Sequence, residues 1–122
     1  MIGTLDQPMP EKGFLELLKD RMKAGVVRYT NYDQPVSIVA VCGGSGSFLL
    51  GDAIRDGAHA FVTADFKYHQ FFDGDNKTLI ADIGHYESEQ FTKELIYSDL
   101  KGKFTTFALR LSELNTNPIN YF

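Results

Sequence analysis

The stretch from residue 36 to residue 63 constrains the fold more than any other part of the sequence. It begins with a nearly continuous run of apolar and β-branched residues, Val36–Cys42, which is typical of a strand buried on both faces. The glycine cluster Gly43–Gly46 follows, then a one-sided helical pattern over Phe48–Asp56 and a second apolar run, Ala60–Thr63. A strand, a tight turn, a helix and a strand in this order predict a βαβ unit, and therefore a sheet with parallel pairs.

Elements on both sides extend this unit into an α/β fold. Apolar residues at helical spacing predict an amphipathic helix over Glu11–Ala24. The segment Met1–Pro10 carries two prolines and a glycine with no period, so we expect an extended lead-in without an element of its own. The remaining predicted elements are a β-rich run at Val26–Tyr29, helical turns at Phe66–Phe72, a buried strand at Thr78–Asp82, the longest helix at Glu87–Lys101 and a last strand at Phe104–Leu109. Together they predict one α/β domain over residues 1–122, a three-layer sandwich with a mixed, partly parallel sheet flanked by helices.

Composition and charge exclude several classes of protein. A chain of 122 residues with 43% apolar residues is large enough for one core, which argues against a disordered or disulfide-scaffold protein. The net charge of −4 and the absence of any run of Lys or Arg argue against a nucleic-acid partner. Cys42 is the single cysteine, and nothing resembles a signal peptide or a membrane span. We therefore expect a cytoplasmic protein with no membrane partner.

The glycine cluster is the first candidate binding feature. Free backbone N–H groups between a strand and a helix favour an anion, so Gly43–Ser47 is a candidate phosphate site. Its spacing matches neither the dinucleotide fingerprint nor the phosphate-binding loop of nucleotide triphosphatases. The favoured interpretation is a sharp turn with positive φ and close packing of helix against strand.

A histidine and a glutamate at helical spacing form the second candidate site. The segment Gly84–Glu89 follows a strand that ends at Asp82, which places it at the carboxyl edge of the sheet, where open α/β sheets hold their ligands. One helix face would carry both His85 and Glu89, with Cβ atoms about 5–6 Å apart. An imidazole and a carboxylate suit a divalent Zn, Mn or Fe ion. On spacing alone, a histidine at a helix start beside a glutamate that the helix dipole favours is the alternative.

A third cluster follows the strand that ends at Thr63. An acid, a base and an imidazole there, Asp65, Lys67 and His69, are candidates for hydrolytic catalysis, and a solvated loop with aromatic anchors is the alternative. His59 is predicted to be a surface turn residue, and Cys42 to be inert packing.

Three segments, VAVCGGSGSFL, GAHAFVTADFKYH and IADIGHYESE, resemble in order and spacing the C-terminal half of the GTP cyclohydrolase 1 type 2 homologue family. These dinuclear-metal proteins are also described as like Ngg-one-interacting factor three. In the family the GHY-x-x-E motif supplies a histidine and a glutamate to a two-metal centre, which implies His85 and Glu89 as ligands here. The other family ligands, an adjacent histidine pair and an aspartate, lie in the N-terminal half, whereas this chain has only three histidines and none is adjacent to another.

The resemblance implies two similar α/β halves that face each other with the metals between them, and ring-shaped hexamers of the complete protein. The family name implies hydrolytic opening of the GTP imidazole ring. We therefore expect a C-terminal domain that contributes His85 and Glu89 to a site for two divalent ions (Zn, Mn or Fe), that needs its N-terminal half as a partner, and that is inactive alone. The alternative is an oligomerisation or protein-interaction module without catalytic activity, whose exposed aromatic face associates with other copies.

Overall fold

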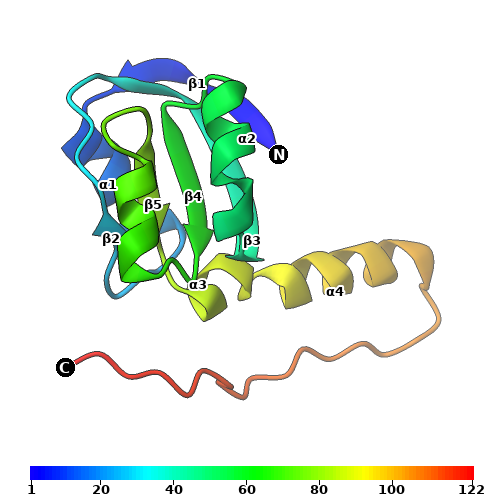
Figure 1. Ribbon diagram of the computed structural model, residues 1–122. Coiled ribbons are helices and arrows are strands. Elements are labelled where there is room, and N and C mark those ends of the chain that lie inside the picture. Colours follow the sequence, from blue (N-terminus) through cyan, green and yellow to red (C-terminus); the bar gives the residue numbers. More distant parts are fainter.

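Strands and helices alternate through most of the chain, and the structure, a computed structural model, describes all residues from Met1 to Phe122 (Figure 1). The strands are β1 (Ile2–Met9), β2 (Arg28–Tyr29), β3 (Val36–Ser45), β4 (Ala60–Ala64) and β5 (Leu79–Asp82). The α-helices are α1 (Glu11–Arg21), α2 (Leu50–Arg55), α3 (His85–Glu89) and α4 (Thr92–Lys103), and the 3-10 helices are η1 (Ser47–Leu49) and η2 (Tyr68–Asp73).

The five strands form one mixed sheet in the order β1-β3-β4-β5-β2. β3, β4 and β5 are parallel, with Val41 opposite Val62 and Val62 opposite Ala81. The edge strands β1 and β2 pair antiparallel with β3 and β5. The parallel β3–α2–β4 unit confirms the βαβ prediction, and the mixed sheet confirms the predicted α/β class.

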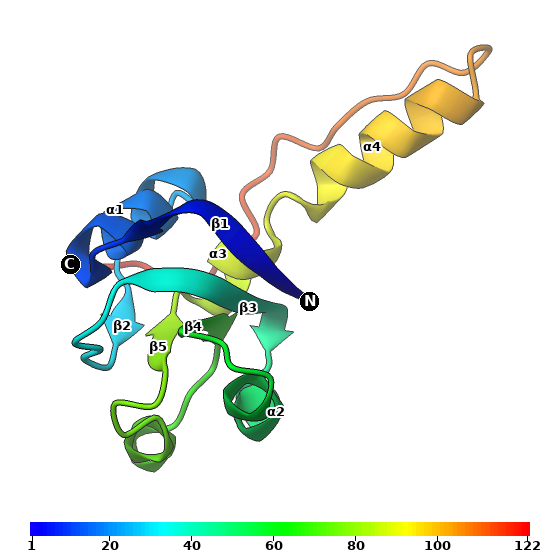
Figure 2. The ribbon, with the colours of Figure 1, turned by 90° about the horizontal axis from the view of Figure 1, so that it is seen from above.

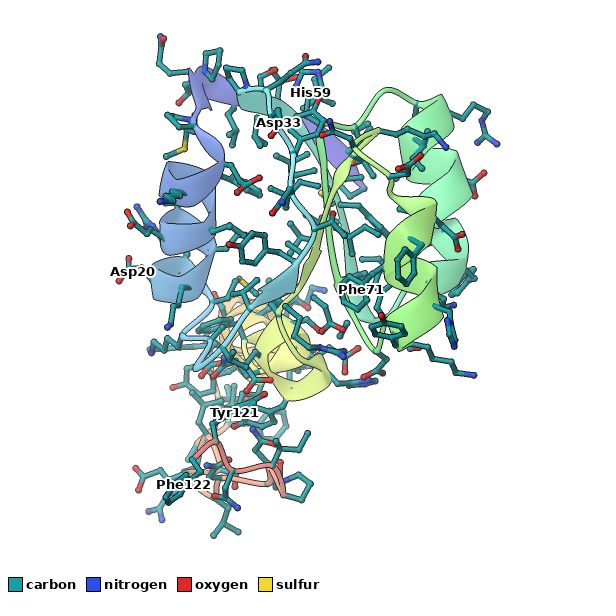
Figure 3. All side chains as sticks on the ribbon, turned by 60° about the vertical axis from the view of Figure 1, so that its left-hand side comes forward. Asp20, Asp33, His59, Phe71, Tyr121 and Phe122 are labelled. Carbon is teal, nitrogen blue, oxygen red and sulfur yellow. The ribbon has the colours of Figure 1, made fainter.

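Helices cover both faces of the sheet, as the view from above shows (Figure 2). Side chains alternate along β4: Ala60 and Val62 join the core beneath α1, whereas Phe61 joins the core beneath α2 and η2. In Figure 3, α1 lies on one side of the sheet, and Phe71 of η2 lies on the other. Side chains of a strand point alternately to opposite faces of the sheet, so apolar residues at successive positions bury both faces. Helices cover each face, which gives three layers.

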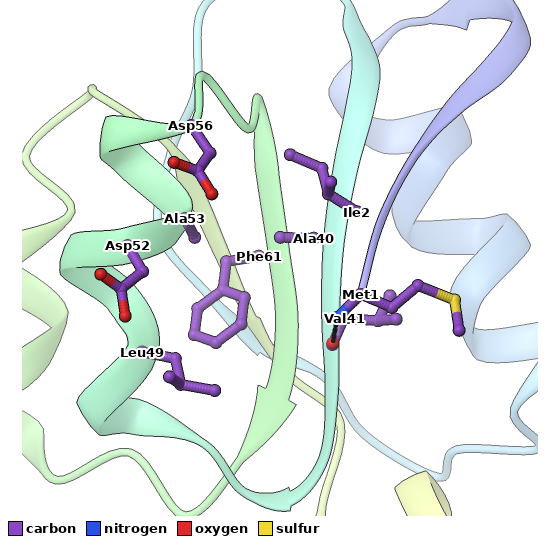
Figure 4. Close-up of a pocket in the computed structure, with 9 residues that line it drawn as sticks. All are labelled: Met1, Ile2, Ala40, Val41, Leu49, Asp52, Ala53, Asp56 and Phe61. Atoms are coloured by element: carbon purple, nitrogen blue, oxygen red, sulfur yellow. Dashed lines mark hydrogen bonds between the residues drawn. The ribbon is translucent and has the colours of Figure 1, made fainter.

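The prediction that Val36–Cys42 is buried on both faces is only partly correct. Val36 and Ala40 are buried, but Val41 is 41% exposed. It lines a cavity of about 250 Å³ between α2 and strands β1 and β3, into which Phe61 points (Figure 4). The end of β3 next to the edge strand β1 is therefore only partly covered.

The predicted lead-in is in fact an edge strand. Residues Ile2–Met9 form β1, whose Gly3 lies opposite Val39 of β3. The pairing shifts register between Thr4 and Met9, around a proline at position 8. An edge strand tolerates a proline because only one of its sides is hydrogen-bonded. Residues 2–9 are therefore extended because they pair with β3, and not because of their own sequence pattern.

The prediction for the C-terminal third is wrong in two respects. The helix expected over Glu87–Lys101 is two helices, α3 and α4, which are separated by Gln90 and Phe91. The strand expected over Phe104–Leu109 is absent, and the chain instead runs back along α4 without regular structure (Figure 1). Apolar residues form a strand only where a hydrogen-bonding partner is available, and the sheet ends at β1 and β2.

Candidate functional site

The carboxyl ends of the three parallel strands meet at one edge of the sheet. Ser45 at the end of β3 lies opposite Ala64 of β4, and Thr63 lies opposite Asp82 of β5. Helix α3 begins directly beyond this edge (Figure 1). Parallel strands bring the residues that follow them together, so this edge carries the candidate residues from all three clusters.

β3 continues to Ser45, three residues beyond the predicted end at Cys42, and Gly44 lies where its pairing with β4 is irregular. The φ of Gly44 is +62°, as the sequence predicts for the glycine cluster. Its N–H donates to Ser88 Oγ over 2.8 Å, and its carbonyl accepts a bond from Thr63 Oγ1 over 3.0 Å. A Cβ atom at this position would lie 2.7 Å from Glu89 Oε1. The N–H of Gly44 is therefore engaged by α3, which favours positive φ and close packing of helix against strand as the role of the glycine cluster over the phosphate cradle.

His85 lies between two carboxylates. Its Nδ1 is 2.6 Å from Asp65 Oδ2, and its Nε2 is 3.4 Å from Glu89 Oε2. The hydrogen bond to Asp65 raises the pKa of His85 above its ordinary value of 6.5, against a smaller opposing effect of burial. With its Nδ1 proton held by Asp65, a neutral His85 presents the Nε2 lone pair toward Glu89.

Asp65 reaches His85 through an uncommon backbone conformation. Its φ is +61°, in the left-handed region that few residues other than glycine adopt, although aspartate is one of those that tolerate it. Such conformations concentrate at functional sites because the surrounding structure must hold them in place. Asp65 is therefore placed to orient the imidazole of His85.

Asp82 holds together the loops that carry Asp65 and His85. It is buried, and it accepts bonds from the N–H groups of Phe66 (2.9 Å) and Gly84 (3.1 Å). Its charge is balanced by an ion pair with Arg28 of β2. The sequence gives no indication of this role, because Arg28 lies 54 residues away along the chain.

Lys67 and His69 do not join this group. Neither side chain forms a hydrogen bond or an ion pair with His85 or Glu89, and both are exposed around the start of η2. Their proposed catalytic role stays a prediction, while Asp65 of the same cluster does contact His85.

His59 and Cys42 lie outside the candidate site. His59 is half-buried at the opposite end of the sheet, where its Nδ1 accepts a bond from the N–H of Ser37 at the start of β3 (Figure 3). It is therefore less exposed than the predicted surface turn residue. Cys42 is half-buried, and its Sγ lies 3.5 Å from the carbonyl of Gly43.

The donor set of His85 and Glu89 fits one edge of a metal coordination sphere. Two N or O ligands bound tetrahedrally at about 2.1 Å are themselves about 3.4 Å apart. The observed separation of Nε2 and Oε2 is 3.4 Å, and Gly44 leaves the adjacent space free of a Cβ atom. No group of three or more His, Cys, Asp and Glu side chains in the chain is arranged to hold a metal ion. A metal ion held by His85 and Glu89 would therefore require further donors from elsewhere.

Comparison with known proteins identifies the family. A family model described as Duf34/NIF3 (NGG1p interacting factor 3) matches residues 1–118. This chain belongs to the Duf34/NIF3 family. The GTP cyclohydrolase 1 type 2 homolog of Staphylococcus epidermidis is 36% identical over 99% of this chain, and that of Bacillus subtilis is 33% identical over 98%. The resemblance found in three motifs of the sequence is thereby confirmed.

The chain spans about a third of the length of these relatives, since the match covers 34% of each. Among solved structures, Staphylococcus aureus protein SA1388 superposes with a TM-score of 0.85 at 26% identity, over 99% of this chain and 41% of that one. A Bacillus cereus protein related to NIF3 gives a TM-score of 0.82 at 28% identity, over 99% and 35%. The similarity therefore includes α4 and the C-terminal residues as well as the sheet. None of the helices is both long enough and apolar enough to span a bilayer.

Proposed function

We propose that this chain is the C-terminal half of a dinuclear-metal, hydrolase-like protein, to which it contributes His85 and Glu89 as metal ligands. The separation of 3.4 Å between His85 Nε2 and Glu89 Oε2 carries the proposal, because it matches two ligands on one ion. Membership of the Duf34/NIF3 family supports it. Zn, Mn and Fe suit this mixture of nitrogen and oxygen donors.

Each residue of the site has a distinct task. Two bound divalent ions would supply an activated water and stabilise negative charge on a phosphoryl or carbonyl oxygen. Asp65 holds the Nδ1 proton of His85 and keeps Nε2 available, in the manner of carboxylates behind metal-bound histidines. Gly44 keeps the space beside Glu89 free of side-chain atoms. The relatives' name, GTP cyclohydrolase 1 type 2 homolog, makes GTP the first substrate to test.

The chain alone supplies an incomplete site. His59, His69 and His85 are its only histidines, and His59 lies at the other end of the sheet. We infer that the missing N-terminal half provides the remaining ligands and closes the site. Such a partner is consistent with the share of the relatives, about a third, that this chain covers.

Metal content of the complete protein tests the ligand assignment. His85→Ala and Glu89→Ala should each deplete bound metal strongly and leave the circular dichroism spectrum unchanged, because both side chains are about half exposed. His59→Gln is the matched control, since this histidine lies at the opposite end of the sheet. Full metal occupancy in both variants would refute the assignment.

A second candidate function, self-association, rests on the exposed apolar side chains of the arm, which is α4 together with residues 104–114. The arm projects from the sheet (Figure 2) and exposes Leu95, Ile96, Phe104, Phe107, Leu111 and Leu114. Large apolar side chains exposed along one projecting segment indicate a candidate interaction site. We propose that copies of this chain associate through the arm, and that the complete protein forms the ring hexamer that the family resemblance implies.

Light scattering during gel filtration tests the second candidate. Leu95→Ser combined with Phe107→Ser should reduce the oligomeric mass. Phe48→Ser is the control, because Phe48 is similarly exposed but belongs to η1 and not to the arm. A monomeric parent chain at tens of micromolar would exclude association through the arm.

A further inference from the structure

Glu87 is a buried carboxylate on the helix that carries the candidate ligands. It is only 5% exposed, and its Oε2 has no hydrogen-bond partner. Its Oε1 accepts only long bonds, from the Tyr121 hydroxyl (3.4 Å) and the Asn117 amide (3.5 Å). Burying a carboxylate with so few partners opposes folding, and a buried polar group of this kind points to a role other than stability.

Glu87 lies on the face of α3 opposite to the candidate ligands. Successive residues of an α-helix are about 100° apart, so Glu87 is about 160–200° around the axis from His85 and Glu89. Ser88 faces β3, where it accepts a bond from the N–H of Gly44. Because α3 has only five residues, contacts on its faces rather than its own hydrogen bonds must fix its rotation.

The ring of Tyr121 lies beside Glu87, in a space that Gly25 and Gly84 leave free of side-chain atoms. A Cβ atom at Gly25, beyond α1, would lie 3.1 Å from the Tyr121 ring, and one at Gly84 would lie 3.3 Å from its hydroxyl and collide with the Glu87 carboxylate. Figure 3 shows Tyr121 at the same end of the molecule as α3. Burial, and next the charge of Glu87, raise the pKa of Tyr121, as expected for a phenol inserted beside a carboxylate.

The segment that Tyr121 anchors also forms part of the site. Ser112, Leu114 and Thr116 line a cavity of about 740 Å³, and His85 and Glu89 line the same cavity. This volume lies within the range of small-molecule sites. The C-terminal segment is therefore a wall of the space next to the candidate ligands.

We propose that Tyr121 and Asn117 form a latch on Glu87, which fixes the rotation of α3 and the direction of the His85 and Glu89 side chains, and holds the C-terminal wall of the cavity in place. Tyr121, Asn117 and Glu87 are thus positioning residues that touch no metal or substrate. The effect of the latch on metal binding rests on the proposed function. The effect of the latch on the mobility of α3 is independent of the proposed function.

Hydrogen exchange of Tyr121→Phe in this chain, together with metal titration of the same variant in the complete protein, tests the latch. The variant removes one hydroxyl and keeps the ring, so exchange of the α3 amides should become about two- to threefold faster, the weak end of the range for one hydrogen bond, because this bond is 3.4 Å long. Zn²⁺ affinity, measured against a chromophoric chelator, should fall within the same range. Tyr97→Phe is the matched control, because Tyr97 lies on α4 and its ring contacts Lys101.

A second variant separates the latch from a general loss of stability. Glu87→Gln keeps the shape of the side chain and removes its charge, so adding Tyr121→Phe to it should change exchange less than Tyr121→Phe does in the parent. Unchanged α3 exchange in Tyr121→Phe, or faster exchange throughout the sheet, would overturn the latch. A complete protein that binds no Zn²⁺, while α3 exchange in this chain still responds to Tyr121→Phe, would support the latch and count against the proposed function.

Discussion

Replacement of Asp65 by asparagine tests how far the orientation of His85 determines metal affinity. Asparagine tolerates the left-handed φ of +61°, so the backbone should persist while the carboxylate charge is lost. Carboxylates behind metal-bound histidines are worth about 10–100-fold in metal affinity. His85 and Asp65 are 50% and 46% exposed, and solvent weakens their interaction, so we expect the lower end, about tenfold or 1.4 kcal/mol.

A Zn²⁺ titration of the complete protein in competition with a chromophoric chelator measures the effect. Asp56→Asn is the matched control, because it removes the same charge from a similarly exposed carboxylate that pairs with Arg55 on α2. The ¹⁵N shifts of the His85 ring provide a second measurement, since the population of the Nδ1–H tautomer should fall. Affinity within twofold of the parent, together with an unchanged tautomer, would refute the orienting role of Asp65.

The stability of Asp65→Asn relative to the parent should depend on pH. Asp65 raises the pKa of His85 in the folded chain above 6.5, so protonated His85 stabilises the fold below about pH 6.5, and this contribution is lost as pH rises through the folded-state pKa. The melting temperature of Asp65→Asn should therefore lie below that of the parent at pH 5.5, and the gap should narrow above the folded-state pKa. A gap that widens with rising pH would contradict this sign.

Three further outcomes are expected. Gly44→Val should destabilise the fold by about 1–3 kcal/mol more than Gly57→Val in thermal melts; both glycines have positive φ, but only a Cβ at position 44 meets Glu89. Stability of the parent should fall as pH rises above 10, because the raised pKa of Tyr121 keeps its proton in the folded state after the unfolded tyrosine has ionised; Tyr121→Phe should show a shallower fall. The isolated chain with excess Mn²⁺ or Zn²⁺ should show no loss of GTP above background, and turnover that disappears in His85→Ala would prove that this half builds a working site alone.

Much of the fold could be predicted because its information is local. The helical spacing of apolar residues located α1, and the runs around Gly43–Gly46 located β3, α2 and β4 with their parallel pairing. The positive φ of Gly44 was expected from the glycine cluster, although Gly44 lies within β3 and not in a turn after it. His85 and Glu89 could be placed on one face because a separation of four residues depends only on the geometry of a single helix turn.

Contacts between distant segments could not be predicted in this way. Strand β1 is ordered by pairing with β3. The run Phe104–Leu109 is more apolar than β1 but finds no partner, so it does not form a strand. Asp65 reaches His85 across 20 residues, and Tyr121 reaches Glu87 across 34. The spacing of apolar residues in the sequence predicts which face of its own helix or strand a residue occupies. Which side chain it meets is decided by how the elements pack, because hydrogen-bonding partners and burial are properties of the assembled layers.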